Sequence, residues 1–236
     1  MYHCFLIHSS ADVVNSGDYS FFVDTALPTI GKKRGITHKA SDARRSHFEN
    51  DSRATIDLLY KHPSVVYYTV FNEGWGQYDA DRIYRELKAY DLTRIFDATS
   101  GWFVENDSDV TSDHVYFKPL NEKTLSFDPS RPSVLSEFGG YSCKIEGHSF
   151  NLDKTYGYST CKTVEEFEKA FIKLYRDEVI PAIRRGLCAT VYTQVSDVED
   201  ETNGILTYDR QICKLDEKKM TDLAKELDDV FKEVAK

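Results

Sequence analysis

The chain has 236 residues, 41% hydrophobic and 29% charged, which is the composition of a folded globular protein and not of a disordered one. Its formal net charge of -9 argues against nucleic acid and anionic membranes as partners, because binding to phosphate groups needs an excess of Lys and Arg. No run of about 18 apolar residues is present, so no membrane-spanning helix is expected.

The start of the chain and its cysteines indicate a cellular compartment. Residues 1–8 lack the basic head and the long apolar run of a signal peptide. The cysteines are odd in number and scattered, with neither paired metal-ligand spacing nor a disulfide framework. We therefore expect a protein of the reducing cytoplasm. The five cysteines are Cys4, Cys143, Cys161, Cys188 and Cys213.

The first sixty residues form the least regular part of the sequence. An ordered element is expected to begin within residues 18–22, and residues 31–50 are predicted to be loop or weak helix. Apolar spacing over residues 52–61 then predicts a short helix that ends before Pro63.

After Pro63, strands alternate with helices. The continuous β-branched and aromatic run 65–71 is typical of a strand buried on both faces of a parallel sheet. A capping sequence at residues 163–166 begins a long helix that Pro181 should kink or end and that Gly186 stops. Further strands are predicted over residues 94–99, 113–117, 133–138 and 187–195, with further helices over 79–90 and 216–235.

This alternation predicts a parallel α/β architecture. Five good strands and one weak strand near the start fall short of a closed (β/α)8 barrel, which has eight strands and about 250 residues. We therefore expect a single, incomplete barrel domain over residues 1–236, with strands three or four to eight present. Its start, residues 1–51, is irregular, and its closing helix has Leu223, Leu227, Val230 and Phe231 facing inward.

Two glutamates, Glu73 and Glu137, stand at the carboxyl ends of predicted strands, which is the end that carries the active site in a β/α barrel. Glycoside hydrolysis needs one protonated and one ionised carboxyl beside the bond. A separation of about 5 Å gives retention of configuration, and roughly 6.5–9.5 Å gives inversion. From the pattern alone, two surface glutamates at strand ends are an equally good interpretation.

Several neighbours could bind a sugar. Asn72 offers an amide beside Glu73, and Trp75 and Trp102 offer aromatic faces, although packing at the rim explains each tryptophan equally well. His114 and Tyr116 alternate along one strand and so share a side, where Tyr116 could reach the nucleophile and His114 a sugar hydroxyl. A lone histidine on a strand is more often structural.

An acidic group follows the last strand. It could bind sugar hydroxyls or a divalent cation, but a solvated acidic loop is the favoured interpretation. Its members are Asp197, Glu199, Asp200 and Glu201.

The sequence resembles the family 2 glycoside hydrolases, which include β-galactosidases, β-glucuronidases and β-mannosidases. The resemblance covers roughly residues 52–215 and is most specific around the two glutamates. The matching segments are 62–66 and 71–77 (Phe-Asn-Glu-Gly-Trp-Gly-Gln), 97–102, 112–116, 132–141 (with Ser-Glu-Phe-Gly-Gly), 192–199 and 203–204.

The resemblance implies a (β/α)8 catalytic domain, a retaining mechanism and a carbohydrate substrate. Glu73 would be the general acid and then base, and Glu137 the nucleophile. Asn72 matches the family residue that contacts the sugar 2-hydroxyl, and Tyr116 the tyrosine beside the nucleophile. Gln194, in the segment that resembles a β-galactosidase-like subgroup, is counted with the substrate-binding residues.

The departures from the family pattern also carry expectations. We expect the family's β-sandwich domains and first two barrel strands to be absent from these residues, since residues 11–31 resemble the segment around and just after the third strand. No Glu-x-His precedes Glu73, so we expect no metal and no cofactor. Asn121-Glu122-Lys123 has the spelling of the glucuronidase motif but lies before Glu137, which favours a β-galactosidase-like enzyme.

Two hypotheses remain open. The first is an exo-acting β-glycosidase truncated at its amino end. The second is an inactive remnant or carbohydrate-binding fragment that needs a partner, or a homo-oligomer that covers its open strand edges. A non-sugar hydrolase is disfavoured, because the sequence has no Gly-x-Ser-x-Gly elbow and no His-Glu-x-x-His helix.

Overall fold

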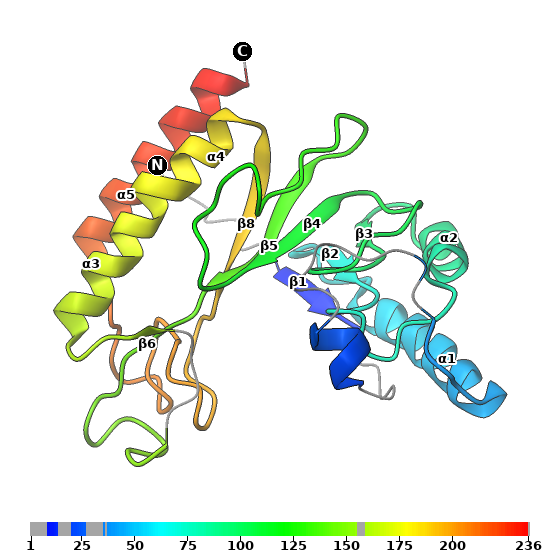
Figure 1. Cartoon of the computed structure of the whole chain (residues 1–236), viewed down its shortest axis with the longest axis horizontal. Coiled ribbons are helices and arrows are strands. Elements are labelled where there is room, and N and C mark those ends of the chain that lie inside the picture. The colour runs from blue at the N-terminus through cyan, green and yellow to red at the C-terminus, as the bar shows by residue number, and fades with distance from the viewer. Residues whose placement is uncertain (1–8, 14–19, 27–34, 36, 155–158, 236) are drawn as a thin grey trace. The chain divides into compact units, whose positions relative to one another are not determined.

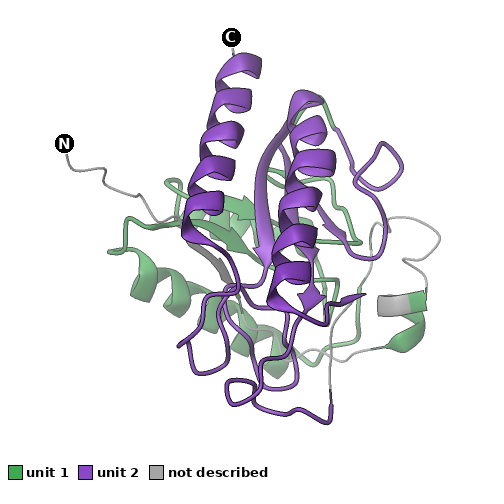
Figure 2. Ribbon diagram, turned by 90° about the vertical axis from the view of Figure 1, so that its left-hand side faces the viewer, with its two compact units in different colours: residues 1–112, 128–132 green, residues 113–127, 133–236 purple. Residues whose placement is uncertain are grey.

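The computed structural model forms two compact units, which Figure 2 shows in different colours. The first holds residues 1–112 and 128–132, and the second holds residues 113–127 and 133–236. The expectation for residues 1–8 and part of that for residues 31–50 lie outside the described part of the chain. The structure describes residues 9–13, 20–26, 35, 37–154 and 159–235.

The first unit is built on a parallel sheet with the strand order β1-β2-β3. The central strand β2 belongs to the predicted run 65–71, and the end of that run, Val70 and Phe71, is fully buried. Its β-branched and aromatic side chains therefore form much of the core of this unit. The strands are β1 (Ser9–Asp12), β2 (Val65–Thr69) and β3 (Ile95–Asp97).

Two amphipathic helices pack on this sheet, α1 (Asp42–Leu59) and α2 (Ala80–Tyr90). The predicted helix 79–90 is confirmed. The prediction of a helix that begins at Ser52 is wrong, because α1 begins ten residues earlier. Ser41 caps it by accepting a hydrogen bond from the Arg44 backbone N–H at 3.3 Å. A short π-helical turn, Phe21–Ala26, is the ordered element that the sequence placed near residues 18–22.

The second unit contains the strands β5 (Ser133–Gly139) and β8 (Leu187–Thr193), which pair in parallel. Their sheet has the order β4-β5-β8, and β4 (Thr111–Val115) begins in the first unit and ends in the second. A separate two-stranded parallel sheet is formed by β6 (Tyr141–Ser142) and β7 (Ser159–Thr160).

The helices of the second unit form one long rod beside a second helix (Figure 1). The rod contains a π-helical turn directly before Pro181, because proline has no N–H to continue the regular hydrogen-bond ladder. In the closing helix, Leu223 and Val230 are buried as predicted. Phe231 is 39% exposed, so the prediction that its side chain faces inward is wrong. The rod runs through α3 (Val164–Leu174), the turn Tyr175–Val179 and α4 (Ile180–Arg184), and the closing helix is α5 (Glu217–Val234).

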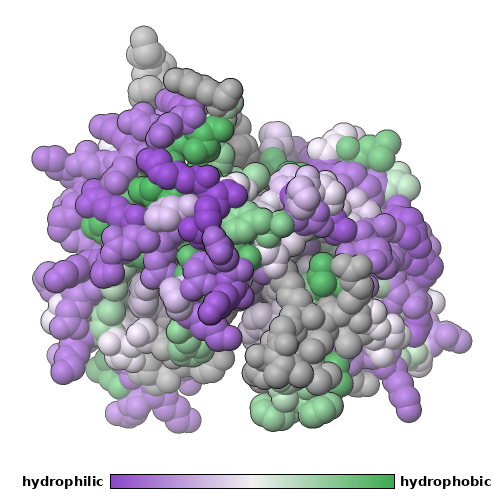
Figure 3. Space-filling view, turned by 45° about the horizontal axis from the view of Figure 1, so that its top comes forward, coloured by the Kyte–Doolittle hydropathy of each residue, from purple (hydrophilic) through white to green (hydrophobic). Residues whose placement is uncertain are grey.

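The two larger sheets hold six strands in the described ranges, whereas a (β/α)8 barrel has eight. The predicted α/β class with an incomplete barrel is therefore confirmed. Among the described residues, no helix is long and apolar enough to cross a membrane. On the face shown in Figure 3, hydrophilic side chains predominate and the hydrophobic ones form small separate groups.

Candidate active site

The candidate residues fall in both units and form one group in each. We call the first the Glu73 group and the second the Glu137 group. The Glu73 group is Asn72, Glu73, Trp75 and Trp102, and the Glu137 group is His114, Tyr116, Glu137 and Gln194.

Asn72 continues the pairing between β2 and β3 one step beyond the strands. It forms an isolated parallel bridge with Ser100, whose backbone N–H donates to the Phe71 carbonyl at 2.9 Å. The Ser100 hydroxyl also donates to Asn72 Oδ1 at 2.5 Å. Asn72 is therefore held at the carboxyl end of β2, and its amide nitrogen is the group left to donate to a ligand.

The backbone turns sharply at Glu73, which has a φ of +53°, and at Gly74, which has a φ of +74°. A left-handed glutamate is uncommon and costs about 1–3 kcal/mol, and such strained residues cluster at functional sites. At Gly74 a Cβ atom would lie 2.4 Å from the fully buried ring of Phe103. Only glycine fits there, so the turn that presents Glu73 is fixed by packing as well as by backbone freedom.

A buried hydrogen bond between two polar side chains also supports this turn. The Gln77 amide donates to Glu105 Oε1 at 2.7 Å, and the Gly35 backbone N–H donates to the same oxygen at 3.0 Å. Gln77 is fully buried and Glu105 is 5% exposed, so the bond between these two side chains is formed away from solvent. Sequence reasoning missed Glu105, because its partners lie 28 and 70 residues away.

The two tryptophans differ in exposure. Trp75 is 50% exposed on the turn itself, whereas Trp102 is partly buried. An exposed indole beside a carboxyl suits a sugar platform, because a sugar ring presents apolar C–H groups to an aromatic face. Binding of sugar by either ring stays a prediction.

Glu137 lies in a β-bulge of β5. Between Leu135 and Phe138, β5 takes three steps while β8 takes two, from Thr190 to Tyr192. The extra residue is Ser136 or Glu137. Because bulges redirect side chains next to active sites, this irregularity sets the direction in which the Glu137 carboxyl points.

Two side chains of the Glu137 group contact that carboxyl. The Tyr116 hydroxyl donates to Glu137 Oε2 at 2.6 Å and also lies 3.0 Å from Thr193 Oγ1. His114 Nδ1 lies 3.4 Å from the same carboxylate oxygen, and its side chain is 1% exposed. The expected shared side of His114 and Tyr116 is confirmed. A short bond from a phenol stabilises the ionised form of a carboxyl, which is the form a nucleophile needs.

Gln194 is engaged by its own chain. Its amide nitrogen donates to Glu201 Oε2 at 2.9 Å and to Asn203 Oδ1 at 2.8 Å. Both amide hydrogens are thereby used, so Gln194 could serve a substrate only through its oxygen. Its role in binding substrate stays a prediction.

Asp197 corrects the expectation of a solvated acidic loop. It is fully buried, and its Oδ1 accepts hydrogen bonds from Lys214 Nζ at 2.7 Å and from the Gly204 backbone N–H at 2.8 Å. Burial raises the pKa of Asp197, and the Lys214 ammonium opposes this rise. Asp197 is therefore a structural residue, whereas Glu199 is exposed as expected.

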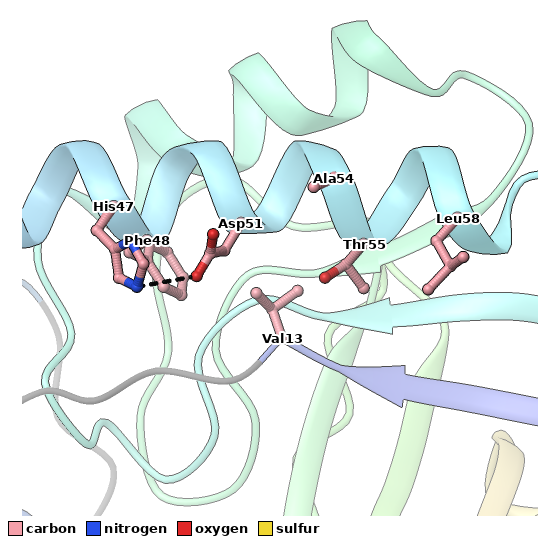
Figure 4. Close-up of a pocket in the computed structure, with 7 residues that line it drawn as sticks. All are labelled: Val13, His47, Phe48, Asp51, Ala54, Thr55 and Leu58. Atoms are coloured by element: carbon pink, nitrogen blue, oxygen red, sulfur yellow. Dashed lines mark ion pairs between the residues drawn. The ribbon is translucent and has the colours of Figure 1, made fainter.

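A hollow of about 390 Å³ lies along the flank of α1 (Figure 4). Val13 and side chains of α1 line it, and His47 and Asp51 form an ion pair of 3.1 Å on its wall. No member of the Glu73 or Glu137 group lines this hollow, so it gives no support to their assignment.

Comparison with protein families gives a match over residues 29–223 to the TIM barrel domain of the glycosyl hydrolases family 2. The chain belongs to this family. The match extends the resemblance around the two glutamates to most of the chain. No curated protein matches the sequence.

Among solved structures, the chain is similar in fold to several β-glucuronidases, at low sequence identity. The match to a β-glucuronidase from an uncultured Clostridium species covers 95% of this chain and 45% of the enzyme, with 12% sequence identity and a TM-score of 0.51. The match to the Dictyoglomus thermophilum β-glucuronidase covers 94% of this chain and 45% of the enzyme, with 16% identity and a TM-score of 0.50. The match to a Bacteroides uniformis β-glucuronidase covers 87% of this chain and 30% of the enzyme, with 14% identity and a TM-score of 0.51. These identities show a shared fold alone, and the chain spans less than half the length of each enzyme.

Proposed function

We propose that this family 2 chain carries the catalytic residues of a retaining β-glycoside hydrolase that acts on terminal β-linked sugars, most readily β-galactosides. The observation that carries the proposal is the Glu137 carboxyl in its bulge, with the Tyr116 hydroxyl 2.6 Å from Oε2. A short hydrogen bond from a phenol orients a carboxyl and favours its charged form, which supports the proposal that Glu137 attacks an anomeric carbon.

In the proposed reaction, Glu137 attacks the anomeric carbon while the Glu73 carboxylic acid protonates the leaving oxygen. A glycosyl-enzyme ester forms on Glu137. Glu73, now ionised, then removes a proton from water, which attacks the ester and releases a sugar of retained configuration. This mechanism requires the two carboxyls to meet at about 5 Å in the working enzyme, and that separation stays a prediction.

The remaining candidates would bind the sugar. Asn72 would donate its amide to the 2-hydroxyl, since Ser100 already occupies its oxygen. Trp75 and Trp102 would stack on the sugar, and His114 would meet one of its hydroxyls. Gln194 could contribute only its oxygen.

The sugar itself is the finer part of the proposal. The Asn121 side chain accepts a hydrogen bond from the Lys123 backbone N–H at 2.8 Å, so it closes its own turn. This bond uses only the oxygen of the Asn121 amide, so the galactoside is favoured by the position of residues 121–123 before Glu137 and not by this contact. The similarity in fold to β-glucuronidases makes a β-glucuronide the rival substrate.

The nucleophile can be tested by trapping. An activated 2-deoxy-2-fluoro-β-galactoside should form a stable ester on Glu137, because the fluorine slows both steps of the reaction while the activated leaving group speeds only the formation of the ester. Tandem mass spectrometry should locate the label in the tryptic peptide 124–144, which contains Glu137. The matching fluoro-glucuronide is the comparison, and Glu137→Gln is the control. A label on another residue would contradict the assignment.

A second candidate function follows from the fact that the chain spans less than half of the enzymes whose fold it shares. In this version the chain binds carbohydrate without turning it over, or works only with a partner or as a homo-oligomer. In the described residues β1 is an end strand of its sheet, which a second copy could cover. An apparent mass above 27.1 kDa that rises with concentration in light scattering would support this version.

A further inference from the structure

Two cysteines of the second unit, Cys143 and Cys161, come directly after two paired strands, β6 and β7. β6 and β7 pair in parallel with Tyr141 opposite Ser159 and Ser142 opposite Thr160. The Cys161 backbone N–H then donates to the Ser142 carbonyl at 2.7 Å. In a parallel ladder, the residue whose N–H donates such a bond stands opposite the residue that follows the acceptor. The bond from Cys161 to Ser142 therefore places Cys161 opposite Cys143.

Opposite residues in a parallel pair point to the same face, and their strands lie about 4.8 Å apart. This spacing falls within the range of roughly 4.4–6.8 Å between Cα atoms that a disulfide can bridge. Both side chains also pack against one hydrophobic cluster, with Phe167, Phe171 and Leu223. Cys143 is fully buried and Cys161 is partly buried, and both are free thiols.

We propose that Cys143 and Cys161 form an oxidative modification site, which a hydroperoxide such as hydrogen peroxide converts into an intramolecular disulfide. The sulfur of Cys161 attacks the peroxide, the O–O bond breaks, and a sulfenic acid and one water are produced. The Cys143 sulfur then attacks the sulfenic sulfur and forms the S–S bond, and a second water leaves. Two thiols are oxidised by two electrons, and one peroxide is reduced.

Exposure sets the order of these steps. Cys161 is the partly exposed partner and meets the oxidant first, whereas the buried Cys143 acts as the resolving thiol. Burial raises the pKa of both thiols above the ordinary value of 9.0, with the nearby Lys214 ammonium opposing the rise for Cys143. Since the thiolate is the reactive form, the disulfide should form more quickly as the pH increases from 7 toward 9.

The disulfide would close the loop between the two cysteines, residues 144–160, onto the segment that follows β5. Cys143 lies six residues after Glu137, so the bond would tie down the chain that leaves the candidate nucleophile strand. The proposal does not depend on glycosidase activity, because it concerns only thiol geometry.

The test is peptide mapping of the folded chain after hydrogen peroxide treatment and alkylation with N-ethylmaleimide. The expected result is a peptide pair joined through Cys143 and Cys161, residues 124–144 linked to 155–162, about 2 Da lighter than the two reduced peptides. Dithiothreitol should abolish the pair. The oxidised chain should have a Tm about 5–10 °C higher than the reduced chain.

Cys188 and Cys213 provide matched controls, because both are exposed free thiols outside the pair of Cys143 and Cys161. Cys188→Ser and Cys213→Ser should leave the joined peptide and the Tm shift intact, whereas Cys161→Ser should abolish both. Recovery of Cys143 and Cys161 as separate alkylated or sulfonic peptides, while Cys188 is oxidised, would overturn the proposal. So would a disulfide that joins either residue to Cys188 or Cys213.

Discussion

At the scale of single residues, the hydrogen bond from the Tyr116 hydroxyl to the Glu137 carboxyl makes the first prediction. Tyr116→Phe removes a charge-assisted hydrogen bond, which is worth about 1.5–3 kcal/mol, and kcat/KM for nitrophenyl glycosides should fall roughly 10- to 100-fold. Tyr141→Phe deletes a hydroxyl in the same unit and should keep activity near that of the unchanged chain. Equal losses in the two variants would show that the Tyr116 hydroxyl has no particular effect on Glu137.

The buried pair of Asp197 and Lys214 makes a second prediction at this scale. Lys214→Met leaves a buried carboxylate without its cation, and the free energy of unfolding should fall by about 3–5 kcal/mol in urea titrations at pH 7. Asp197→Leu combined with Lys214→Met should recover much of this loss.

The loss in Lys214→Met should depend on pH. Burial raises the folded-state pKa of Asp197, so the penalty is complete above that pKa and disappears as the carboxyl becomes protonated below it. The variant should therefore lose less stability relative to the unchanged chain at pH 5 than at pH 7. A loss that grows as the pH falls from 7 to 5 would contradict this assignment.

The sequence could predict individual site residues only where strand patterning placed them. The apolar run 65–71 placed Asn72 and Glu73 at the end of a strand, and the alternation along the next predicted site strand placed His114 and Tyr116 on one side. Thr193, which lies 3.0 Å from the Tyr116 hydroxyl, was missed because 77 residues separate the two. The buried Lys214 was missed because lysine is almost never fully buried.

At the scale of elements, the turn after β2 yields a prediction that separates backbone strain from crowding. Gly74→Ala and Gly147→Ala both place alanine at positive φ, +74° and +79°, but only the first meets Phe103. Gly147→Ala should cost about 1 kcal/mol and Gly74→Ala about 1–3 kcal/mol more, in urea titrations of the free energy of unfolding. Equal losses would show that Phe103 does not confine this turn.

Helix α1 shows what local patterning misses. Its buried stripe is Phe48, Ser52 and Ile56, and the middle member is polar, so the apolar spacing was interrupted. The Ser52 hydroxyl is satisfied within the helix by the Phe48 carbonyl at 2.7 Å. An ion pair of 2.8 Å between Glu49 and Arg82 attaches α1 to α2 across 33 residues, which no local pattern reveals.

At the scale of the whole molecule, strand–helix alternation was enough to predict an incomplete parallel barrel, because each strand and helix has its own hydrophobic period. The division into two compact units was not predicted, since it depends on packing between distant segments. The order β4-β5-β8 likewise follows from pairing across the long helical segment between β5 and β8.

The measurement that tests the proposed mechanism most directly is hydrolysis of a panel of nitrophenyl β-glycosides, including the galactoside and the glucuronide. We predict turnover of the galactoside that disappears in Glu137→Gln. Glu73→Gln should retain much more activity on an activated dinitrophenyl galactoside than on a methyl galactoside, because an activated leaving group needs less help from an acid. Turnover that survives Glu137→Gln would contradict the assignment of Glu137 as nucleophile. Absence of turnover by the folded chain on every sugar would contradict catalysis by this chain.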